Sequence, residues 1–203
     1  MDDTLIYRKI ELEELNLDLF RKFERRQNVA RQLQKQGDAW VEKPVSLVEE
    51  WSREDYEFLL TCLQNTIQEG GVVFGAFEGN AVKGFASISG KPFGYAGTYR
   101  DLTSLHVSRE LRGRGIGTRL FHLAAGWALA MGGQKLYIAA NPAIESQLFY
   151  RALGCTDAME LNEEHMKNGP MDRQWSMCCK KTPRQSLFLC DIKNAIHFGV
   201  KRL

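Results

Sequence analysis

The chain has 203 residues, a formal net charge of +2 and a pI near 8.3, with 44% hydrophobic and 26% charged residues. These values are typical of a globular protein with one sizeable core, and they argue against disordered, collagen-like and membrane-embedded chains. The charge is too small to indicate a nucleic-acid-binding surface. Met1 to Thr4 lack the basic and apolar segments of a secretion signal, so we expect a cytoplasmic protein without nucleic-acid or membrane partners.

The cysteines form an odd set without a C-x-x-C pair, which argues against a zinc site and against a disulfide framework. We expect them to be reduced and mostly buried, and we expect no bound metal. They are Cys62, Cys155, Cys178, Cys179 and Cys190.

The first part of the chain predicts an edge strand followed by a long helix. Ile6 to Ile10 is rich in β-forming residues, and the apolar residues between Leu12 and Lys35 recur at roughly helical spacing. We therefore predict a helix over that second segment.

A second helix has clear signals at both ends. Ser52 can cap it and Asp55 completes a capping-box-like pair, while Trp51 can pack on Tyr56 across the first turn. Gly70-Gly71 can end it. The sequence thus predicts two helices before the first strand pair of the core.

The rest of the chain alternates strands and helices, which predicts a mixed α+β fold. The helix after the glycine-rich segment has one apolar stripe, with Ile116 and Leu120 as its first members. The predicted elements are a hairpin of 72–77 and 82–88, a strand 99–107, a helix from 116 to Gly132, a strand 135–140, a helix 142–153 and a strand 174–179.

Residues 182–203 follow a Lys-Lys-Thr-Pro break and are too apolar for an ordinary disordered tail. We expect one domain over 1–181 and a C-terminal extension over 182–203. The extension would serve as an extra packing element or as a subunit contact.

The segment Arg112-x-x-Gly115-x-Gly117-Thr118 lies between a predicted strand and an amphipathic helix. Backbone N–H groups at a helix start have no intrahelical acceptors, and the helix dipole adds partial positive charge there. Glycines, including Gly113, let the backbone approach a pyrophosphate without a Cβ in the way, and Arg114 adds positive charge. A tight turn requiring positive φ would explain the same glycines.

Two common phosphate motifs do not fit this segment. A nucleotide P-loop needs Gly-Lys-Ser/Thr, and this triplet does not occur in the chain. A dinucleotide fingerprint needs a glycine three residues after Gly115, where Thr118 stands.

The segment instead resembles the coenzyme A signature of GNAT acetyltransferases, Arg/Gln-x-x-Gly-x-Gly/Ala, with a branched apolar residue, Val107, five residues before it. The resemblance continues to 149–155, which is similar to the family's Tyr-x-x-x-Gly-Phe box with Cys155 in place of Phe. It covers roughly residues 72–180. It implies a mostly antiparallel sheet flanked by helices, whose fourth and fifth strands splay apart around acetyl-CoA.

The resemblance also implies a set of cofactor contacts. The backbone of Leu105, His106 and Val107 would pair with the pantetheine arm, and the loop from Arg112 through Ile116 to Thr118 would wrap the pyrophosphate. The strand 135–140 would form the far wall.

Two residues match catalytic positions of the family. Tyr150 matches the tyrosine that protonates the departing coenzyme A thiolate, and its alternative role is an aromatic packing in the core. Asp101 is the candidate base, although Thr103 stands where another branch has glutamate and many members use water. By period-two alternation we expect Asp101 and Thr103 to share a strand face with Val107.

Asn141 is similar to a family asparagine that contacts the cofactor, but it lies nine residues before Tyr150 where seven is usual. Because Pro142 follows it, we expect Asn141 to cap the next helix. The side chain of His106 should point away from the face of Val107, which argues for a structural role.

The resemblance implies an N-acetyltransferase that moves the acetyl group of acetyl-CoA to a primary amine. The alternative is a non-catalytic coenzyme A-binding or ligand-sensing module of the same fold. The expected partner is a small-molecule or peptide amine, and a second copy of the chain is a further candidate partner. The acceptor would be selected by residues 12–69 and 91–97.

Overall fold

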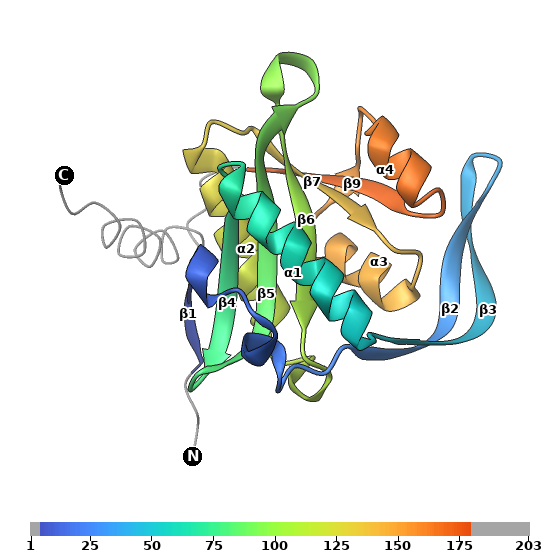
Figure 1. Cartoon of the computed structure of the whole chain (residues 1–203). Coiled ribbons are helices and arrows are strands. Elements are labelled where there is room, and N and C mark those ends of the chain that lie inside the picture. Colours follow the sequence, from blue (N-terminus) through green and yellow to red (C-terminus); the bar gives the residue numbers. More distant parts are fainter. Residues whose placement is uncertain (1–4, 180–203) are drawn as a thin grey trace.

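One seven-stranded sheet organises residues 5–179, the part of the chain that the computed structural model describes (Figure 1). Its strand order is β1-β4-β5-β6-β7-β9-β8, and neighbours run antiparallel except β6 and β7, which are parallel. The strands are β1 (Ile6–Lys9), β4 (Val72–Glu78), β5 (Ala81–Phe93), β6 (Tyr99–Val107), β7 (Lys135–Ala140), β8 (Thr156–Asp157) and β9 (Arg173–Cys178). The expected α+β fold and its main strands are confirmed. The extension over 182–203 lies outside the described residues.

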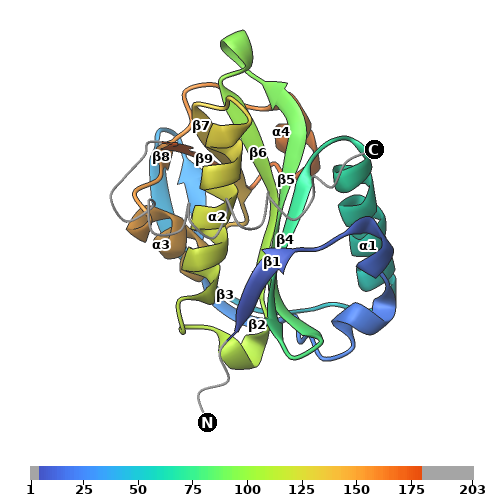
Figure 2. The ribbon, with the colours of Figure 1, turned by 90° about the vertical axis from the view of Figure 1, so that its left-hand side faces the viewer.

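Helices cover both faces of the sheet (Figure 2). The apolar stripe of α2 packs on one face with Phe74 and Ile138, and α1 packs on the other face with Phe77 and Phe85. Two core layers therefore hold β4, β5 and β6 in place from both sides. The helices are α1 (Arg53–Gln68), α2 (Ile116–Ala130), α3 (Ile144–Ala152) and α4 (Glu163–Asn168).

The start of α1 has the local structure that its sequence predicts. The Ser52 hydroxyl accepts from the Asp55 N–H at 3.2 Å, and the Asp55 carboxylate accepts from the Ser52 N–H at 2.7 Å. The Trp51 and Tyr56 rings meet edge to face at 5.3 Å. The capping box and the hydrophobic staple are both confirmed.

The prediction of a helix over residues 12–35 is wrong. Two short 3-10 turns, Leu12–Glu14 and Leu17–Phe20, lead into β2 (Arg26–Gln36), which pairs with β3 (Ala39–Glu50) in a separate antiparallel ribbon. Gly37 and Asp38 form its two-residue turn, with φ +60° at Gly37. A glycine in the first position of a two-residue loop is typical of a type II′ hairpin, and this signal outweighs the approximate helical spacing.

The β2–β3 ribbon stands beside the main sheet (Figure 1). It is tied to the body near the start of α3, where the Leu33 N–H donates to the Pro142 carbonyl at 2.8 Å. The ribbon therefore forms a side wall for the region around α3.

A β-bulge in β6 changes which side chains share a face. Ser104 pairs with Ser87 but Leu102 pairs with Ile88, so one extra residue of β6 is accommodated. Leu102, Leu105 and Val107 consequently all pack on the α2 side of the sheet. Since neighbouring strand residues alternate, Asp101 faces the opposite side. The prediction that Asp101 shares a face with Val107 is wrong, because strict alternation does not continue through a bulge.

All four described cysteines are free thiols. Cys155 and Cys179 are buried, but Cys62 and Cys178 are exposed. The expectation that the cysteines are mostly buried therefore holds for only half of them.

Candidate active site

The strands β6 and β7 pair over three residues and then separate. The pairs run from Tyr99 with Lys135 to Asp101 with Tyr137, while β7 continues to pair with β9 up to Ala140. The predicted splay is confirmed. Beyond Asp101, one edge of β6 is free to pair with an extended ligand.

A cavity of about 870 Å³ occupies this opening. Most of the predicted cofactor-contacting residues line it. They are Leu105, His106, Val107, Arg112, Gly113, Gly115, Ile116, Gly117, Thr118 and Asn141. Tyr150 also lines the cavity, whereas Arg114 is exposed and Asp101 lies outside the lining.

The loop before α2 is shaped by left-handed glycines. Gly113 has φ +75° and Gly115 has φ +78°, and a Cβ added to either would meet no atom within 4 Å. These positions therefore need glycine for backbone conformation rather than for lack of space. Gly115 is the N-cap of α2 and has no side-chain cap, so the first-turn N–H groups face the cavity without an intrahelical acceptor.

Arg112 anchors this loop to β6. Its Nε donates to the Val107 carbonyl at 3.1 Å, and burial, with the nearby Arg25 charge, lowers the pKa of the guanidinium. The positive groups around the loop and the helix dipole together favour an anion there.

Gly117 has a different role from the two loop glycines. It lies in the first turn of α2 without positive φ, and a Cβ there would lie 3.4 Å from the Phe149 ring and 3.6 Å from Val107. A Cβ there would make ordinary van der Waals contacts with both side chains.

Tyr150 reaches the cavity from α3. The residue is 9% exposed, and it packs against Phe149 and Phe121 with ring centroids 5.1 and 6.1 Å away. Burial and the nearby Cys155 thiol raise the pKa of the phenol, so the hydroxyl stays protonated at neutral pH. A neutral phenol at a cavity wall can donate a proton, and its ring also fills the core.

Asn141 does not cap α3, contrary to the prediction. The N-cap is Ala143, without a side-chain cap, because α3 begins two residues later than expected. The Asn141 side chain instead lines the cavity, and its Oδ1 is buried without a hydrogen-bond partner in residues 5–179. It can accept a hydrogen bond from a bound molecule.

Sequence reasoning missed Gln147, which organises the end of β7. Its side chain is buried and donates to the Ala140 carbonyl at 3.2 Å and the Asn141 carbonyl at 2.6 Å. It also accepts from Trp175 Nε1 at 3.0 Å. A polar residue in an otherwise apolar helical stripe was the available signal. Gln147 therefore joins α3 to the end of β7 and to β9.

The ribbon supplies a second unexpected part of the wall. Residues 25–28 line the cavity, although the sequence placed them in a helix. Arg25 is 8% exposed, pairs with Glu49 at 3.0 Å and lies over the Trp51 ring at 5.6 Å. The ion pair therefore closes the base of the ribbon, and Trp51 joins that base to the body through Tyr56 and His106.

His106 points to the α1 side, as predicted. Its ring lies 4.8 Å from the Trp51 ring and 5.3 Å from the Phe85 ring. Burial, with the Arg25 and Arg112 charges, lowers its pKa to about 3. His106 is therefore neutral at physiological pH and acts as a packing residue.

Asp101 is bound by a residue that the sequence did not indicate. His165 of α4 places Nε2 2.6 Å from the Asp101 Oδ2 atom. The other Asp101 oxygen, Oδ1, is buried and has no hydrogen-bond partner within the described chain. The short helix α4 lies between two weakly patterned segments, so only the fold brings the two residues together.

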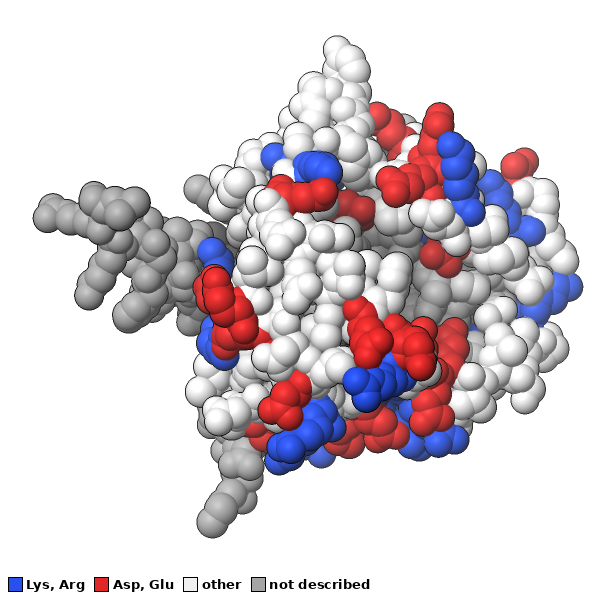
Figure 3. Space-filling view, in the orientation of Figure 1, with Lys and Arg blue, Asp and Glu red and all other residues white. Residues whose placement is uncertain are grey.

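The face that carries α1 and α4 is hollowed beside the ribbon (Figure 3). Charged side chains of both signs lie around this hollow. Exposed acids occur on both helices, Glu163 and Glu164 on α4 and Glu54 and Asp55 on α1. The cavity itself is lined by Asp172 and Glu145 and by four arginines, Arg25, Arg26, Arg109 and Arg112.

No helix in 5–179 is long and apolar enough to cross a membrane. The same range holds no cluster of three or more His, Cys, Asp or Glu side chains arranged for a metal ion.

Comparison with known proteins agrees with this geometry. A family model described as "Acetyltransferase (GNAT) family" matches residues 30–155, more than half of the chain. No curated protein matches the sequence.

This chain matches nearly the whole length of several solved structures that have the same fold. Nourseothricin acetyltransferase has a TM-score of 0.65 at 18% identity, covering 87% of this chain and 99% of its own. A Bacillus anthracis protein provisionally named as a streptothricin acetyltransferase, solved with acetyl coenzyme A, has 0.64 at 16%, covering 86% and 99%. Aminoglycoside 6'-acetyltransferase type Ii has 0.57 at 18%, covering 88% and 99%. The family match and the shared fold agree, and the chain therefore belongs to the GNAT acetyltransferase family.

Proposed function

We propose that this chain is an acetyl-CoA-dependent N-acetyltransferase that acts on a primary amine. The observation that carries the proposal is the cavity at the separated strands, which joins an anion-binding loop to Tyr150. A pyrophosphate at the loop would direct the acyl end of the donor along the free edge of β6.

The donor side is supported by residues of three elements. The loop 112–118 offers the first-turn N–H groups of α2 to the pyrophosphate, and Arg112 adds charge. The free edge of β6 at 105–107 offers backbone groups to the amides of the pantetheine arm. Asn141 Oδ1 can accept from the same arm.

Acetyl-CoA supplies a thioester carbonyl, and the chain must then handle two protons and one developing charge. Tyr150 is positioned to donate a proton to the departing sulfur, since its hydroxyl stays neutral. A backbone N–H of the free β6 edge, such as that of Val107, can stabilise the oxyanion. Asp101 and His165 lie on the face of the sheet opposite Val107, and this pair supplies groups that can take the proton of the ammonium.

The acceptor that we propose is a cationic amine. Asp172 lines the cavity; burial raises the pKa of its carboxyl, the Glu49 charge adds to this increase, and the His165 charge opposes it. Glu163 and Glu164 are exposed on α4, and acidic groups of this kind would attract an ammonium group from solution.

The test is a panel of primary amines assayed with purified protein and acetyl-CoA, following free thiol release. Acetyl-CoA should also raise the Tm by mass action, because it binds only the folded state. A protein that shows the thermal shift but acetylates no amine would instead be a non-catalytic coenzyme A-binding module. A protein that shows neither would refute the proposal.

A further inference from the structure

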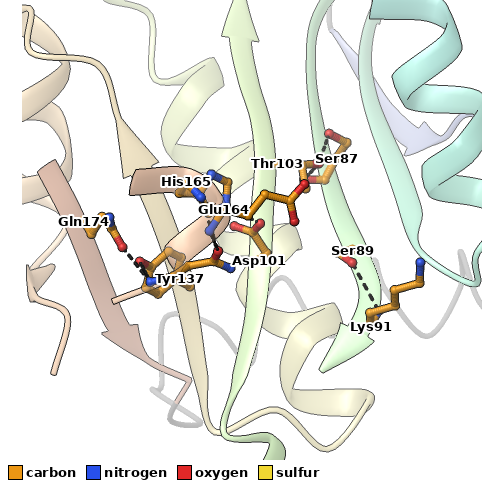
Figure 4. A network of polar contacts seen from close by, with 10 residues as sticks. Ser87, Ser89, Lys91, Asp101, Thr103, Tyr137, Glu164, His165 and Gln174 are labelled. Atoms are coloured by element: carbon orange, nitrogen blue, oxygen red, sulfur yellow. Dashed lines mark hydrogen bonds and ion pairs between the residues drawn. The ribbon is translucent and has the colours of Figure 1, made fainter. Parts of the chain in front are cut away.

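The pair formed by Asp101 and His165 lies at the point where β6 and β7 stop pairing (Figure 4). Asp101 and Tyr137 are the last paired residues of the two strands, and the His165 ring stacks on the Tyr137 ring at 5.9 Å with 24° between their planes. The histidine is therefore held over the vertex from which the cavity opens.

Several contacts fix His165 in this place. Asn162 caps α4 through its side chain, which accepts from the N–H groups of Glu164 and His165. The Asn162 N–H in turn donates to Tyr137 Oη and to Gln174 Oε1, both at 2.9 Å. The short helix is thus tied to β7 and to β9.

The geometry determines which nitrogen of His165 can react. Asp101 Oδ2 accepts from Nε2–H at 2.6 Å, so the neutral ring has its lone pair on Nδ1. No hydrogen bond to Nδ1 occurs within residues 5–179, and 28% of the side chain is exposed. The Asp101 side chain is only 13% exposed, and its Oδ2 atom is engaged by His165.

Titratable groups surround His165 from several parts of the fold. Asp101 lies on β6, Glu164 on α4 itself, and Asp172 on the segment before β9, while Tyr137 of β7 is neutral because burial raises its pKa to about 12. The hydrogen bond that His165 donates to Asp101 raises the pKa of His165, burial lowers it, and the charges of Asp101, Glu164 and Asp172 add to the increase. Asp172 lines the cavity, whereas His165 is outside the lining and is linked to it through the charge of Asp172.

We propose that His165 is the general base that removes a proton from the acceptor ammonium, and that Asp101 is its positioning residue. This inference rests on the acetyl transfer proposed above. It assigns Asp101 an indirect role and gives the proton-accepting role to a residue of α4.

The proton balance is as follows. The ammonium transfers one proton to Nδ1 of His165, directly or through one water. The resulting amine forms the C–N bond as the C–S bond of the thioester breaks, and Tyr150 gives its proton to the sulfur. The nitrogen loses its second proton, which restores the phenol, and His165 releases the first proton to solvent.

The primary experiment compares His165→Gln with Met166→Ala in steady-state kinetics. Glutamine can still donate a hydrogen bond to Asp101 but cannot accept the proton, so kcat should fall by about 10²–10⁴-fold at neutral pH while the KM for acetyl-CoA stays near wild type. Met166 is 46% exposed on the same helix, and its variant controls for disturbance of α4. Rates for His165→Gln within threefold of wild type would overturn the proposal.

Imidazole rescue separates catalysis from structure. His165→Ala should regain part of its rate when imidazole is added, whereas a purely structural histidine would give no rescue. Failure of rescue in a folded protein that still binds acetyl-CoA would count against the general-base role.

The pH profile of Asp101→Asn decides between the two candidate bases. Asparagine can still accept from Nε2–H but removes the charge that raises the pKa of His165, so the acidic limb of kcat/KM should move to lower pH. In the wild type, that limb should coincide with the pKa of His165 measured by NMR. An acidic limb unmoved by Asp101→Asn would overturn the dyad.

The outcomes distinguish this inference from the proposed function. An active wild type whose His165 variants behave normally would refute only the dyad. A wild type that binds acetyl-CoA but acetylates no amine would refute acetyl transfer, and with it the role of His165.

Discussion

Gln147 Oε1 accepts a hydrogen bond from Trp175 Nε1 at 3.0 Å, which joins α3 to β9 beneath the open edge of the cavity. The amide of the same side chain donates to two carbonyls at the end of β7. A single buried glutamine thus satisfies groups that would otherwise be left unpaired where the strands diverge.

Gln147→Leu should lower the free energy of unfolding by about 2–4 kcal/mol, because an apolar side chain leaves the Trp175 donor and two carbonyls without their partner. Denaturant unfolding measures the change. Leu148→Ala, at a site 52% exposed on the same helix, should change the value by about 0.5 kcal/mol or less. Equal losses in the two variants would contradict the organising role of Gln147.

Gly115→Val should weaken acetyl-CoA binding by at least about tenfold. The left-handed conformation at φ +78° costs a β-branched residue about 1–2 kcal/mol, and relief of that strain would move the loop. Gly132→Val is the matched control, since Gly132 has φ +79° and equally open surroundings at the other end of α2. Calorimetry should show weakened binding only for the first variant, and similar affinity in both would place the phosphate site elsewhere.

Tyr150→Phe should lower kcat by about 10²–10⁴-fold with little change in acetyl-CoA affinity. The substitution deletes the hydroxyl and keeps the ring that packs on Phe149. Turnover close to wild type would assign Tyr150 to packing alone. Phe149→Leu tests the neighbouring ring. It should lower the free energy of unfolding and leave kcat at saturating substrate near wild type.

His106→Phe should make the protein less sensitive to acid. The folded-state pKa of His106 is about 3, below the value near 6.5 in the unfolded chain, so the unfolded state binds more protons between these limits. Stability from this residue is therefore present above pH 6.5 and is lost as pH falls towards 3.

The difference between wild type and His106→Phe should grow by up to about 2 kcal/mol between pH 6.5 and pH 5. Urea unfolding at several pH values measures it. His165 has the opposite sign, since its raised pKa adds stability below about pH 6.5 that is lost at higher pH, but it is present in both proteins. Parallel stability curves for the two proteins would show that His106 is not buried in its neutral form.

Predictions from the sequence succeeded where a structure is set by neighbouring residues. The capping box of Ser52 and Asp55 lies within one turn of a helix, and the left-handed Gly115 ends a loop that its own sequence defines. The same local signals could have identified the β2–β3 hairpin, because Gly37-Asp38 is a two-residue turn signal. The helical interpretation failed there because a loose apolar spacing was weighted above that turn.

The sequence by itself determined the glycine-containing loop before α2 and the helix that follows it, because each depends on contacts within a few residues. Only the tertiary structure decided the face on which Asp101 lies and its meeting with His165, 64 residues away. A β-bulge depends on pairing with a neighbouring strand, and the position of α4 depends on hydrogen bonds to β7 and β9. Such contacts leave no periodic pattern in the chain, since they depend on how distant elements pack together.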